Sequence, residues 1–358
     1  MTSFGESHGK IVGVTVDGCP AGLALTEEDV QAEVDHRIPH DAKITSGRVE
    51  KDKVTIQSGV FNGFTTGAPI TMTVENRDVD SSDYEDMKDL PRPGHADYTA
   101  RVKFGGFNDY RGGGRFSGRT TVALIMASAI AKRLLNQFGV DVFAYTKAIG
   151  NVKLDKSLDY EFVRSRRYKT SVRCPDEKCA GDMEEAIVEA RKEGDSLGGI
   201  VEIIGANVPA GVGDPLFDAL DSDIAKALFS IPAVKGVEFG AGFKSATLKG
   251  SENNDGFQIT GKMVGTLTNN HGGVLGGISS GSPIVVRIAV KPTPSIAKEQ
   301  QTVALTTMEN ATLRVVGRHD PCVVPKAVPA AEAAVAITLA DHMIRAGFIP
   351  RVLKAQEQ

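Results

Sequence analysis

A histidine lies in a glycine-flanked turn near the start of the chain. In Gly5-Glu-Ser-His-Gly the glycines on either side of His8 leave room for a ligand to approach the backbone. An imidazole can donate or accept a proton near neutral pH, which makes His8 a candidate general acid or base. The alternative is a hydrogen-bonded histidine of the core that takes no part in chemistry.

Arginines gather between residues 92 and 119. This segment runs from Arg92-Pro-Gly-His-Ala-Asp-Tyr to Asp109-Tyr-Arg-Gly-Gly-Gly-Arg-Phe-Ser-Gly-Arg, and its local charge is +4 in a chain of net charge −4. Guanidinium groups bind carboxylates and phosphates through paired hydrogen bonds, and a glycine run before a helix offers backbone N–H groups to an anion. The segment therefore predicts an anion-binding site. The alternative is a solvated basic face, which is usually rich in lysine and poor in glycine.

A third candidate is Asp320, in Gly317-Arg-His-Asp-Pro-Cys. With Pro321 after it, Asp320 could simply cap a helix that has proline in its first turn. Ser117, at the corresponding position of the arginine-rich segment, has the features of a cap as well. Both residues could also face one shared site, and the sequence leaves the two interpretations open.

The chain contains an internal repeat. Gly5-Glu-Ser-His-Gly-Lys-Ile-Val aligns without gaps with Gly194-Asp-Ser-Leu-Gly-Gly-Ile-Val, at an offset of 189. A second pair consists of residues 58–70 and 272–284, in which Gly59 matches Gly273, and a weaker third pair is Gly114-Arg115 and Gly317-Arg318. Chance similarity between glycine-rich turns would explain one pair, but three pairs in the same order indicate duplication.

The two copies differ at the histidine, because His8 is matched by Leu197. A structural role common to both copies would accept the same apolar residue in both. A histidine in one copy alone therefore indicates specialisation.

The sequences of the two halves predict the same series of strands and helices. Val12, Val14 and Val16 alternate with small or polar residues, as in a half-buried strand. Thr26 and Asp29 predict a capped helix that ends before Pro39. Further strands are expected at 70–74, 200–204 and 284–290, and further helices at 120–138, 218–230 and 326–346. Strands mixed with helices, without regular βαβ spacing, favour the α+β class.

The chain is expected to form a single domain, 1–358, with repeat halves at roughly 5–140 and 194–346. Residues 151–182 have no counterpart in the other half. They carry the basic run Arg164-Ser-Arg-Arg-Tyr-Lys, which predicts a solvated insertion.

Composition excludes several classes of protein. The chain has 358 residues, of which 41% are hydrophobic, so it can bury a large core. Charges of both signs are mixed, which argues against a nucleic-acid-binding or membrane-surface protein, and no stretch reaches the 18 apolar residues of a membrane span. The N-terminus lacks the features of a secretory signal, and the four cysteines are expected to be reduced thiols of a cytoplasmic protein. No dinucleotide fingerprint or P-loop occurs in the sequence, and no metal site is predicted.

Together these motifs resemble the chorismate synthase family. The resemblance extends from residue 4 to about 346 and rests on Gly5-Glu-Ser-His-Gly with Asp17-Gly-x-Pro, Arg92-Pro-Gly-His-Ala-Asp-Tyr, Asp109-Tyr-Arg-Gly-Gly-Gly-Arg, Gly276-Gly-Ile-Ser-Ser-Gly, Lys291-Pro-Thr and Gly317-Arg-His-Asp-Pro. It implies conversion of 5-enolpyruvylshikimate 3-phosphate to chorismate and phosphate. That reaction is an anti-1,4-elimination that needs reduced FMN although no net oxidation occurs. A substrate with two carboxylates and a phosphate agrees with a site rich in arginine.

The resemblance implies that His8, His95 and Asp320 are the catalytic residues. His8 would protonate the departing phosphate, His95 would hold the reduced flavin in its proper protonation state, and Asp320 would relay the substrate proton by way of the flavin ring. Ser7 and Ser117 would orient these groups. The expected FMN contacts are Arg115, Phe116, Ser117, Pro232, Ala233, Gly276, Lys291, Pro292, Thr293, Pro294, Ser295 and Arg318. The residues expected to contact anionic groups of NADPH or of the substrate are Arg37, Lys43 and Arg119.

The resemblance also implies a β-α-β sandwich of two antiparallel sheets flanked by helices, and a homotetramer. NADPH is a candidate reductant for the flavin, and the sequence leaves open whether this chain or an outside protein reduces it. Two other functions remain in competition: a flavoprotein oxidoreductase with net electron transfer, and a non-catalytic anion-binding module that would need neither histidine.

Overall fold

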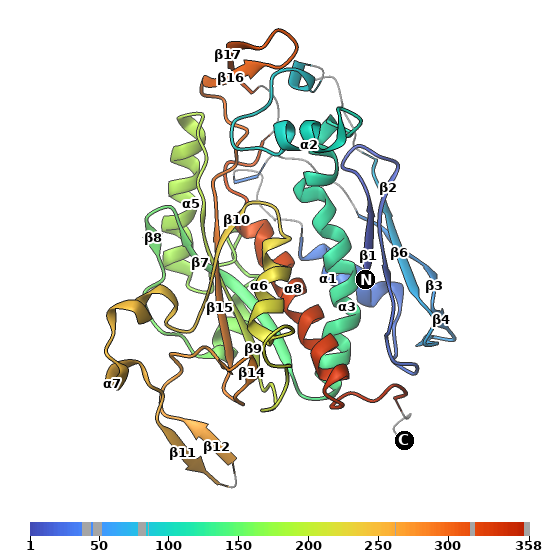
Figure 1. Ribbon diagram of the computed structural model, residues 1–358, viewed down its shortest axis with the longest axis vertical. Helices are drawn as coiled ribbons and strands as arrows, with labels where there is room; N and C mark the ends of the chain where they lie inside the picture. Colours follow the sequence, from blue (N-terminus) through green and yellow to red (C-terminus); the bar gives the residue numbers. More distant parts are fainter. Residues whose placement is uncertain are drawn as a thin grey trace.

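The computed structural model describes residues 1–37, 44–45, 52–77, 84, 86–261, 263–315 and 319–353. Two antiparallel sheets lie on either side of a layer of helices (Figure 1). The first sheet has the strand order β1 (Thr2–Gly5), β2 (Ile11–Val16), β6 (Ile70–Glu75) and β3 (Val54–Ser58). The second has the order β10 (Val234–Phe239), β15 (Ile284–Val290), β9 (Gly199–Ala206), β7 (Asp141–Ile149) and β8 (Val152–Lys153). The predicted α+β class is confirmed.

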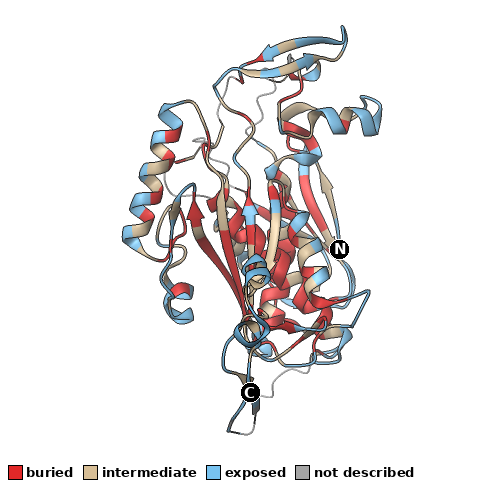
Figure 2. Cartoon of the chain, turned by 60° about the vertical axis from the view of Figure 1, so that its left-hand side comes forward, coloured by how far each residue is buried: buried red, intermediate tan, exposed pale blue. Residues whose placement is uncertain are grey.

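Two long helices, α3 (Thr121–Gln137) and α8 (Val324–Arg345), pack against each other between the sheets. α3 contacts β2 of the first sheet and β7 of the second, and α8 contacts β7 and β9. The sequence led us to expect helices flanking the sheets, but these two lie between them. The reason is their composition: 17 of the 22 residues of α8 are buried, on every side of the helix, so it has no polar face to present to water. Figure 2 shows the buried residues concentrated in these helices and in the strands beside them.

By length and composition, α8 is the one helix of the described residues that could cross a membrane. In the structure 78% of its apolar window is buried inside the protein. The helix therefore has the surroundings of a core helix.

The remaining helices pack around this core. α1 (Glu27–Asp35) contacts α3 and β3, α6 (Leu220–Phe229) contacts α8 and β10, and α5 (Glu177–Lys192) contacts β7 and β8. Among the described residues, the shorter helices are α2 (Asp97–Phe104), α4 (Tyr160–Arg166), α7 (Gly250–Asn253) and the 3-10 turns η2 (Asp86–Lys88), η3 (Arg111–Phe116), η4 (Gly118–Thr120) and η5 (Gly242–Thr247). The short strands of the same residues form hairpins: β4 (Val60–Phe61) with β5 (Phe64–Thr65), β11 (Phe257–Thr260) with β12 (Met263–Thr266), β13 (Val274–Leu275) with β14 (Ile278–Ser279), and β16 (Gln300–Ala304) with β17 (Glu309–Leu313).

The start of α1 has the cap that its sequence predicts. The Thr26 hydroxyl accepts a hydrogen bond from the Asp29 N–H at 3.3 Å, and the Asp29 carboxylate accepts one from the Thr26 N–H at 2.9 Å. This reciprocal pair satisfies two N–H groups that the first turn leaves unpaired.

The two halves have sheets with the same strand order. Taken along the chain, β1, β2, β3 and β6 occupy the places in the first sheet that β7, β9, β10 and β15 occupy in the second. The register agrees as well: Val12 pairs with Val74, and Val201 pairs with Ile288. These pairs correspond under the two offsets found in the sequence, 189 for the earlier strand and 214 for the later one.

One buried hydroxyl closes the same loop in each half. Thr65 Oγ1 accepts from the Leu23 N–H at 2.9 Å and donates to Pro20 O at 2.7 Å. Ser279 Oγ accepts from the Val212 N–H at 2.9 Å and donates to Pro209 O at 2.6 Å. The repeat therefore extends from sequence to individual hydrogen bonds.

The segment 151–182, predicted to be a solvated insertion, is solvated only in part. Val172 and Cys174 within it are fully buried in the main hydrophobic core. Arg167 of the basic run turns inward, since its Nε donates to the buried Glu332 carboxylate at 2.8 Å. Arg164 and Arg166 of the same run stay at the surface, with side chains 52% and 40% exposed.

Thr65→Val and Ser279→Ala test the paired loop closure. Each removes a buried hydroxyl and leaves the N–H and C=O groups that it joined without a partner, so each should lower the free energy of unfolding by about 1–3 kcal/mol. Urea unfolding measures the effect. Thr73→Val, on the outer face of the first sheet, is the control and should change stability by less than about 0.5 kcal/mol. Wild-type stability in both loop variants would contradict a structural role for this closure.

Candidate active site

The turn between β1 and β2 carries His8. It spans Glu6 to Gly9 and is closed by a hydrogen bond from the Gly9 N–H to Glu6 O at 3.1 Å. The His8 side chain is largely buried, and its ring meets the Tyr84 ring edge-on, with 5.1 Å between centroids. The Ser7 N–H donates to Gly114 O at 3.1 Å, which fixes the turn against the glycine run.

The glycine run lies against both candidate histidines. Gly112, Gly113 and Gly114 all have positive φ, at 59°, 81° and 53°. A Cβ on Gly112 would lie 2.3 Å from His8 Cδ2, and a Cβ on Gly113 would lie 3.2 Å from His95 Cε1 and Nε2. Glycine is therefore required here because the imidazoles occupy the space of a side chain. His8 and His95 are 87 positions apart in the sequence, yet they lie against two adjacent glycines of one loop, Gly112 and Gly113.

His95 is held by a buried ion pair. Its Nδ1 lies 2.5 Å from Asp97 Oδ1, and the Arg92 guanidinium donates to both carboxylate oxygens of Asp97, at 2.8 and 2.9 Å. Burial alone would raise the pKa of Asp97, but the hydrogen bonds from Arg92 and His95 hold it well below its usual range. Asp97 is thus a fixed anion beside the imidazole. The sequence analysis missed it, although the spacing Arg92-x-x-His95-x-Asp97 was a signal.

The loop from Lys291 to Ser295 joins this group from the second half. Arg92 donates to Ser295 Oγ at 3.2 Å, and Lys291 Nζ donates to Gly94 O. The Lys291 N–H donates to Ala233 O at 2.9 Å, so the expected contacts at Ala233 and at Lys291 to Ser295 are brought together. Burial, and then the charge of Lys235, lowers the pKa of Lys291.

Asp320 lies just before α8. The N-cap of this helix is Val323, three residues later, so the structure does not place Asp320 as the cap. Its carboxylate instead accepts hydrogen bonds from Lys326 Nζ at 2.6 and 2.8 Å. Burial lowers the pKa of Lys326, and the charge of Asp320 opposes that effect. Ser117 does act as a cap, for η4, by accepting from the Arg119 N–H at 3.3 Å.

Arg119 faces internal acceptors. It is 4% exposed, and its guanidinium donates to Asn76 Oδ1 at 2.9 Å, to Glu75 O at 3.3 Å and to the Asp52 carboxylate. Arg37 donates to the other oxygen of Asp52 at 3.1 Å. That Arg119 or Arg37 binds an external anion stays a prediction.

Gly276 lies away from the other expected FMN contacts. It lies at the tip of the β13–β14 hairpin. Gly273 of this hairpin packs against Ile284, the first residue of β15, whereas Lys291 directly follows the last residue of β15. The seven residues of β15 separate these positions by roughly 20 Å. Within a single chain, Gly276 therefore does not lie beside the other expected FMN contacts around Lys291.

Other expected residues have the following places. Arg115 donates to Ser3 O at 2.8 Å on β1, Phe116 is 37% exposed, and Ser7 is buried. Pro232 and Pro292 to Pro294 adjoin the contacts already described. Lys43 and Arg318 lie outside the described residues.

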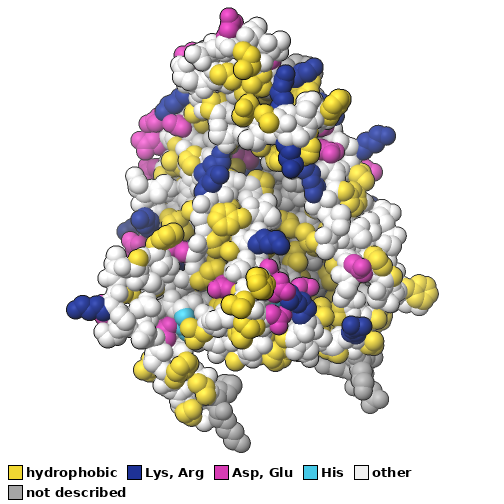
Figure 3. All heavy atoms as spheres, in the orientation of Figure 1, with side chains coloured by type: hydrophobic (Ala, Val, Ile, Leu, Met, Phe, Trp, Pro, Cys, Tyr) yellow, Lys and Arg dark blue, Asp and Glu magenta, His cyan; other side chains and the backbone are white. Residues whose placement is uncertain are grey.

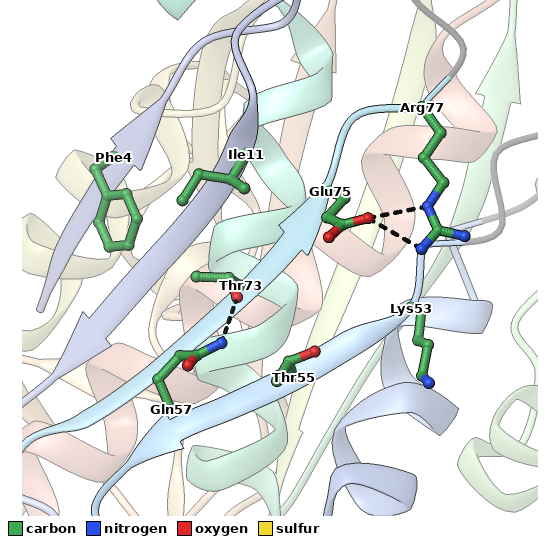
Figure 4. A pocket seen from close by; sticks show the side chains of 8 residues that line it. All are labelled: Phe4, Ile11, Lys53, Thr55, Gln57, Thr73, Glu75 and Arg77. Atoms are coloured by element: carbon green, nitrogen blue, oxygen red, sulfur yellow. Dashed lines mark hydrogen bonds and ion pairs between the residues drawn. The ribbon is translucent and has the colours of Figure 1, made fainter.

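The surface over this region is hollowed and basic. In Figure 3, Lys and Arg side chains surround a recess in the upper part of the face, below the β16–β17 hairpin. A second recess, of about 520 Å³, lies on the outer face of the first sheet (Figure 4). Its lining is mostly threonine, glutamine and charged side chains, with Glu75 and Arg77 paired at 3.0 Å, and it contains none of the expected site residues. Within the described residues, no group of three or more His, Cys, Asp or Glu side chains could hold a metal ion.

Comparisons with known proteins show the family to which the chain belongs. The sequence profile of the chorismate synthase family matches residues 1–344. A chorismate synthase of Korarchaeum cryptofilum is 54% identical over 345 residues, which cover 96% of this chain and 95% of that protein. One of Dehalococcoides mccartyi is 53% identical over 356 residues, covering 99% and 97% of the two chains. A crystal structure of chorismate synthase superposes with a TM-score of 0.75 at 30% identity, covering 96% of this chain and 91% of the other.

Gly112→Ala tests the packing of the glycine run on His8. The new Cβ would overlap the imidazole, so turnover should fall by about 100-fold or more as the ring is displaced. Gly139→Ala, at the end of α3, is the matched control: it has a positive φ of 75° but nothing within 4 Å of the new Cβ. Both variants should lose about 1–2 kcal/mol of stability to backbone strain, but only Gly112→Ala should lose activity. Full activity of Gly112→Ala would show that His8 need not stay where the structure has it.

Proposed function

The chain belongs to the chorismate synthase family, and we propose that the residues around Gly112 to Gly114 form its active centre. The function is that of the family: a lyase of aromatic amino-acid biosynthesis that eliminates phosphate from 5-enolpyruvylshikimate 3-phosphate to give chorismate. The reaction needs reduced flavin and leaves no net change of oxidation state. The observation that carries the assignment of the site is that His8 and His95 flank one glycine run.

The cationic groups of this region suit the substrate. It has two carboxylates and a phosphate. Lys291 reaches Gly94, one residue before His95, and Arg115 directly follows the glycine run that contacts both histidines. Arg92 is already engaged with Asp97, so we assign it to holding His95 rather than to the substrate.

The residues present also suit a flavin. Thr293 Oγ1 is buried without a hydrogen-bond partner among the described residues, in the same loop as the Lys291 amine. An unpartnered buried hydroxyl calls for an acceptor or donor that the chain itself does not supply. We propose that Ala233 and the loop from Lys291 to Ser295 hold FMN, together with Arg115, Phe116 and Ser117. When bound, the reduced flavin supplies the electron density that makes loss of the phosphate feasible.

Three side chains manage protons. His8 donates a proton from its imidazole to the departing phosphate. His95, with Asp97 fixed against Nδ1 and with Nε2 facing Gly113, is assigned to holding the reduced flavin in its proper protonation state. Asp320 accepts the proton that leaves the substrate at a carboxylate oxygen, while Lys326 keeps the carboxylate in place.

NADPH is proposed as the reductant of the flavin, with Arg37 and Lys43 as its anion contacts. Arg37 is held by the buried Asp52 carboxylate, which fixes the direction of its guanidinium. Whether reduction is intrinsic depends on whether this chain oxidises NADPH in the presence of FMN alone.

We propose that the chain is one domain formed by duplication, with halves at roughly 5–140 and 194–346 related by a pseudo-two-fold axis. The common strand order, the corresponding register and the paired Thr65 and Ser279 hydrogen bonds support this origin. They also support a β-α-β sandwich as the description of the fold.

A homotetramer in the cytoplasm is the proposed state. The β11–β12 hairpin projects from the body of the molecule (Figure 1) and exposes Phe257, Ile259 and Val264. Exposed apolar patches of this kind mark contact surfaces, and a further copy of the chain is the proposed partner. The four cysteines are free thiols, which agrees with a reducing compartment. The net charge of −4 offers no support for a nucleic-acid or membrane partner.

An anaerobic assay with photoreduced FMN and 5-enolpyruvylshikimate 3-phosphate tests the function. Chorismate and phosphate should appear in equal amounts while the reduced flavin is not consumed. Consumption of one reduced flavin per product would instead identify an oxidoreductase. Turnover with oxidised FMN and no reductant would rule out the mechanism.

Asp320→Asn tests the proton acceptor. The amide keeps the shape of the side chain but cannot take a proton near neutral pH, so single-turnover rates with reduced FMN should fall by about 10²–10⁴-fold. FMN and substrate binding should change little, whereas the melting temperature should fall because the buried Lys326 amine loses its counter-charge. Asp218→Asn removes an ion pair with Arg345 of similar length, 2.9 Å, and should keep full activity. An active Asp320→Asn enzyme would leave Asp320 as a structural partner of Lys326.

A further inference from the structure

The side chain of Asn76 holds both ends of the turn that carries His8. Its Nδ2 donates to Glu6 O at 3.0 Å and to Gly9 O at 2.8 Å. Its backbone N–H donates to Lys10 O at 3.1 Å. One amide group thus joins Glu6 and Gly9, the first and last residues of the turn, and His8 lies between them.

Asn76 is itself fixed from behind. Arg119 Nε donates to Asn76 Oδ1 at 2.9 Å, and the Arg119 guanidinium also donates to the Asp52 carboxylate, which is 1% exposed. Asp52 is shared with Arg37 at 3.1 Å. Because Arg119 has only donors to offer, it selects the orientation in which the Asn76 oxygen faces it and the Asn76 NH₂ faces the turn.

The second half shows that the fold does not need this polar arrangement. Under the repeat offsets, His8, Asn76 and Arg119 correspond to Leu197, Val290 and Cys322. Val290 and Cys322 are each 3% exposed and belong to the hydrophobic core, and Leu197 packs against that core. Leu197 also forms a bridge with Cys322. In the second half these three side chains are therefore apolar, and Gly198 O, which corresponds to Gly9 O, accepts from the Gly150 N–H at 2.9 Å instead of from an asparagine.

We propose that Asn76 is a positioning residue for His8, oriented by Arg119 and Asp52. The inference rests on the proposed role of His8 for its effect on turnover, but the positioning can be observed without any activity. Polar groups buried in one half and replaced by apolar ones in the other stabilise a particular placement of the histidine rather than the fold in general.

Asn76→Asp is the sharpest test because it keeps the shape of the side chain while it replaces the two N–H donors by an oxygen and adds one negative charge. The carboxylate still accepts from Arg119, but it presents oxygen to Glu6 O and Gly9 O, so the turn is released. Asn76→Ala removes the contacts without adding charge and covers the case in which Asn76→Asp does not fold. Asn207→Asp is the control: Asn207 donates to Gly139 O at 3.2 Å, at an exposed position remote from His8.

Two readouts separate positioning from general stability. In spectra of protein labelled at histidine, the His8 ring resonance, assigned from its loss in His8→Ala, should shift or broaden in both Asn76 variants. The resonance of His271, which is held by Asp255 and by Ser280 at 2.8 Å, should stay unchanged. In the anaerobic assay kcat should fall by about 10- to 100-fold, the scale of one or two lost buried hydrogen bonds, with the substrate KM within about threefold. Adding His8→Ala to either variant should cause no further loss beyond that of His8→Ala alone.

The outcomes distinguish this inference from the proposed function. A shifted His8 resonance with silent kinetics, in a protein whose His8→Ala variant is also fully active, would confirm the positioning and reject the catalytic role of His8. An unchanged His8 resonance would overturn the inference. So would a kcat loss that multiplies with that of His8→Ala, because an independent structural effect is additive in free energy.

Discussion

The buried carboxylate of Glu332 joins the layers of the molecule. It lies on α8 with no exposed surface and accepts hydrogen bonds from Lys132 Nζ on α3 at 2.6 Å, from Arg167 Nε at 2.8 Å and from the Ala144 N–H on β7 at 2.8 Å. Lys132 also donates to Glu33 on α1 at 2.7 Å. Burial alone would raise the pKa of Glu332, but its cationic partners hold it below its usual range. Since breaking a buried ion pair costs about 3–5 kcal/mol, the two long helices, the second sheet and the segment after α4 are fixed relative to one another.

The elements of the fold followed from local pattern, but their arrangement did not. The alternation of Val12, Val14 and Val16 and the cap at Thr26 predicted a strand and a helix that the structure contains. An Ala-rich helix that is apolar all round must be buried, but the pattern does not say whether sheets cover it on one side or on both. The basic run at 164–169 predicted solvent, and Arg164 and Arg166 do lie at the surface. A sequence does not show that Arg167 would meet the carboxylate of Glu332, 165 positions away.

At the site, the sequence predicted which residues matter better than it predicted the structural role of each. The sequence singled out His8 and the glycines at 112–114, but it interpreted the glycines as a source of N–H donors. The structure shows that imidazoles occupy the space beside Gly112 and Gly113, and that the backbone of Asp109 occupies the space beside Gly114. Asp97 and Asn76 were missed because a carboxylate or amide on its own has no signature: Asn76 is recognisable only once β6 brings it to the ends of the β1–β2 turn.

The position of α8 in the chain has a consequence for how the protein folds during synthesis. The first sheet uses only residues up to 75 and the second only residues from 141 to 290, so each can pair its strands without the other. α8 begins at residue 324, after every strand of both sheets, yet it packs against α3, β7 and β9. Until it emerges from the ribosome, the apolar faces that it covers have no partner. Before α8 is synthesised, the nascent chain can hold two paired sheets with an uncovered core, a state that is prone to aggregation and to chaperone binding. Insertion of this one helix then covers the core.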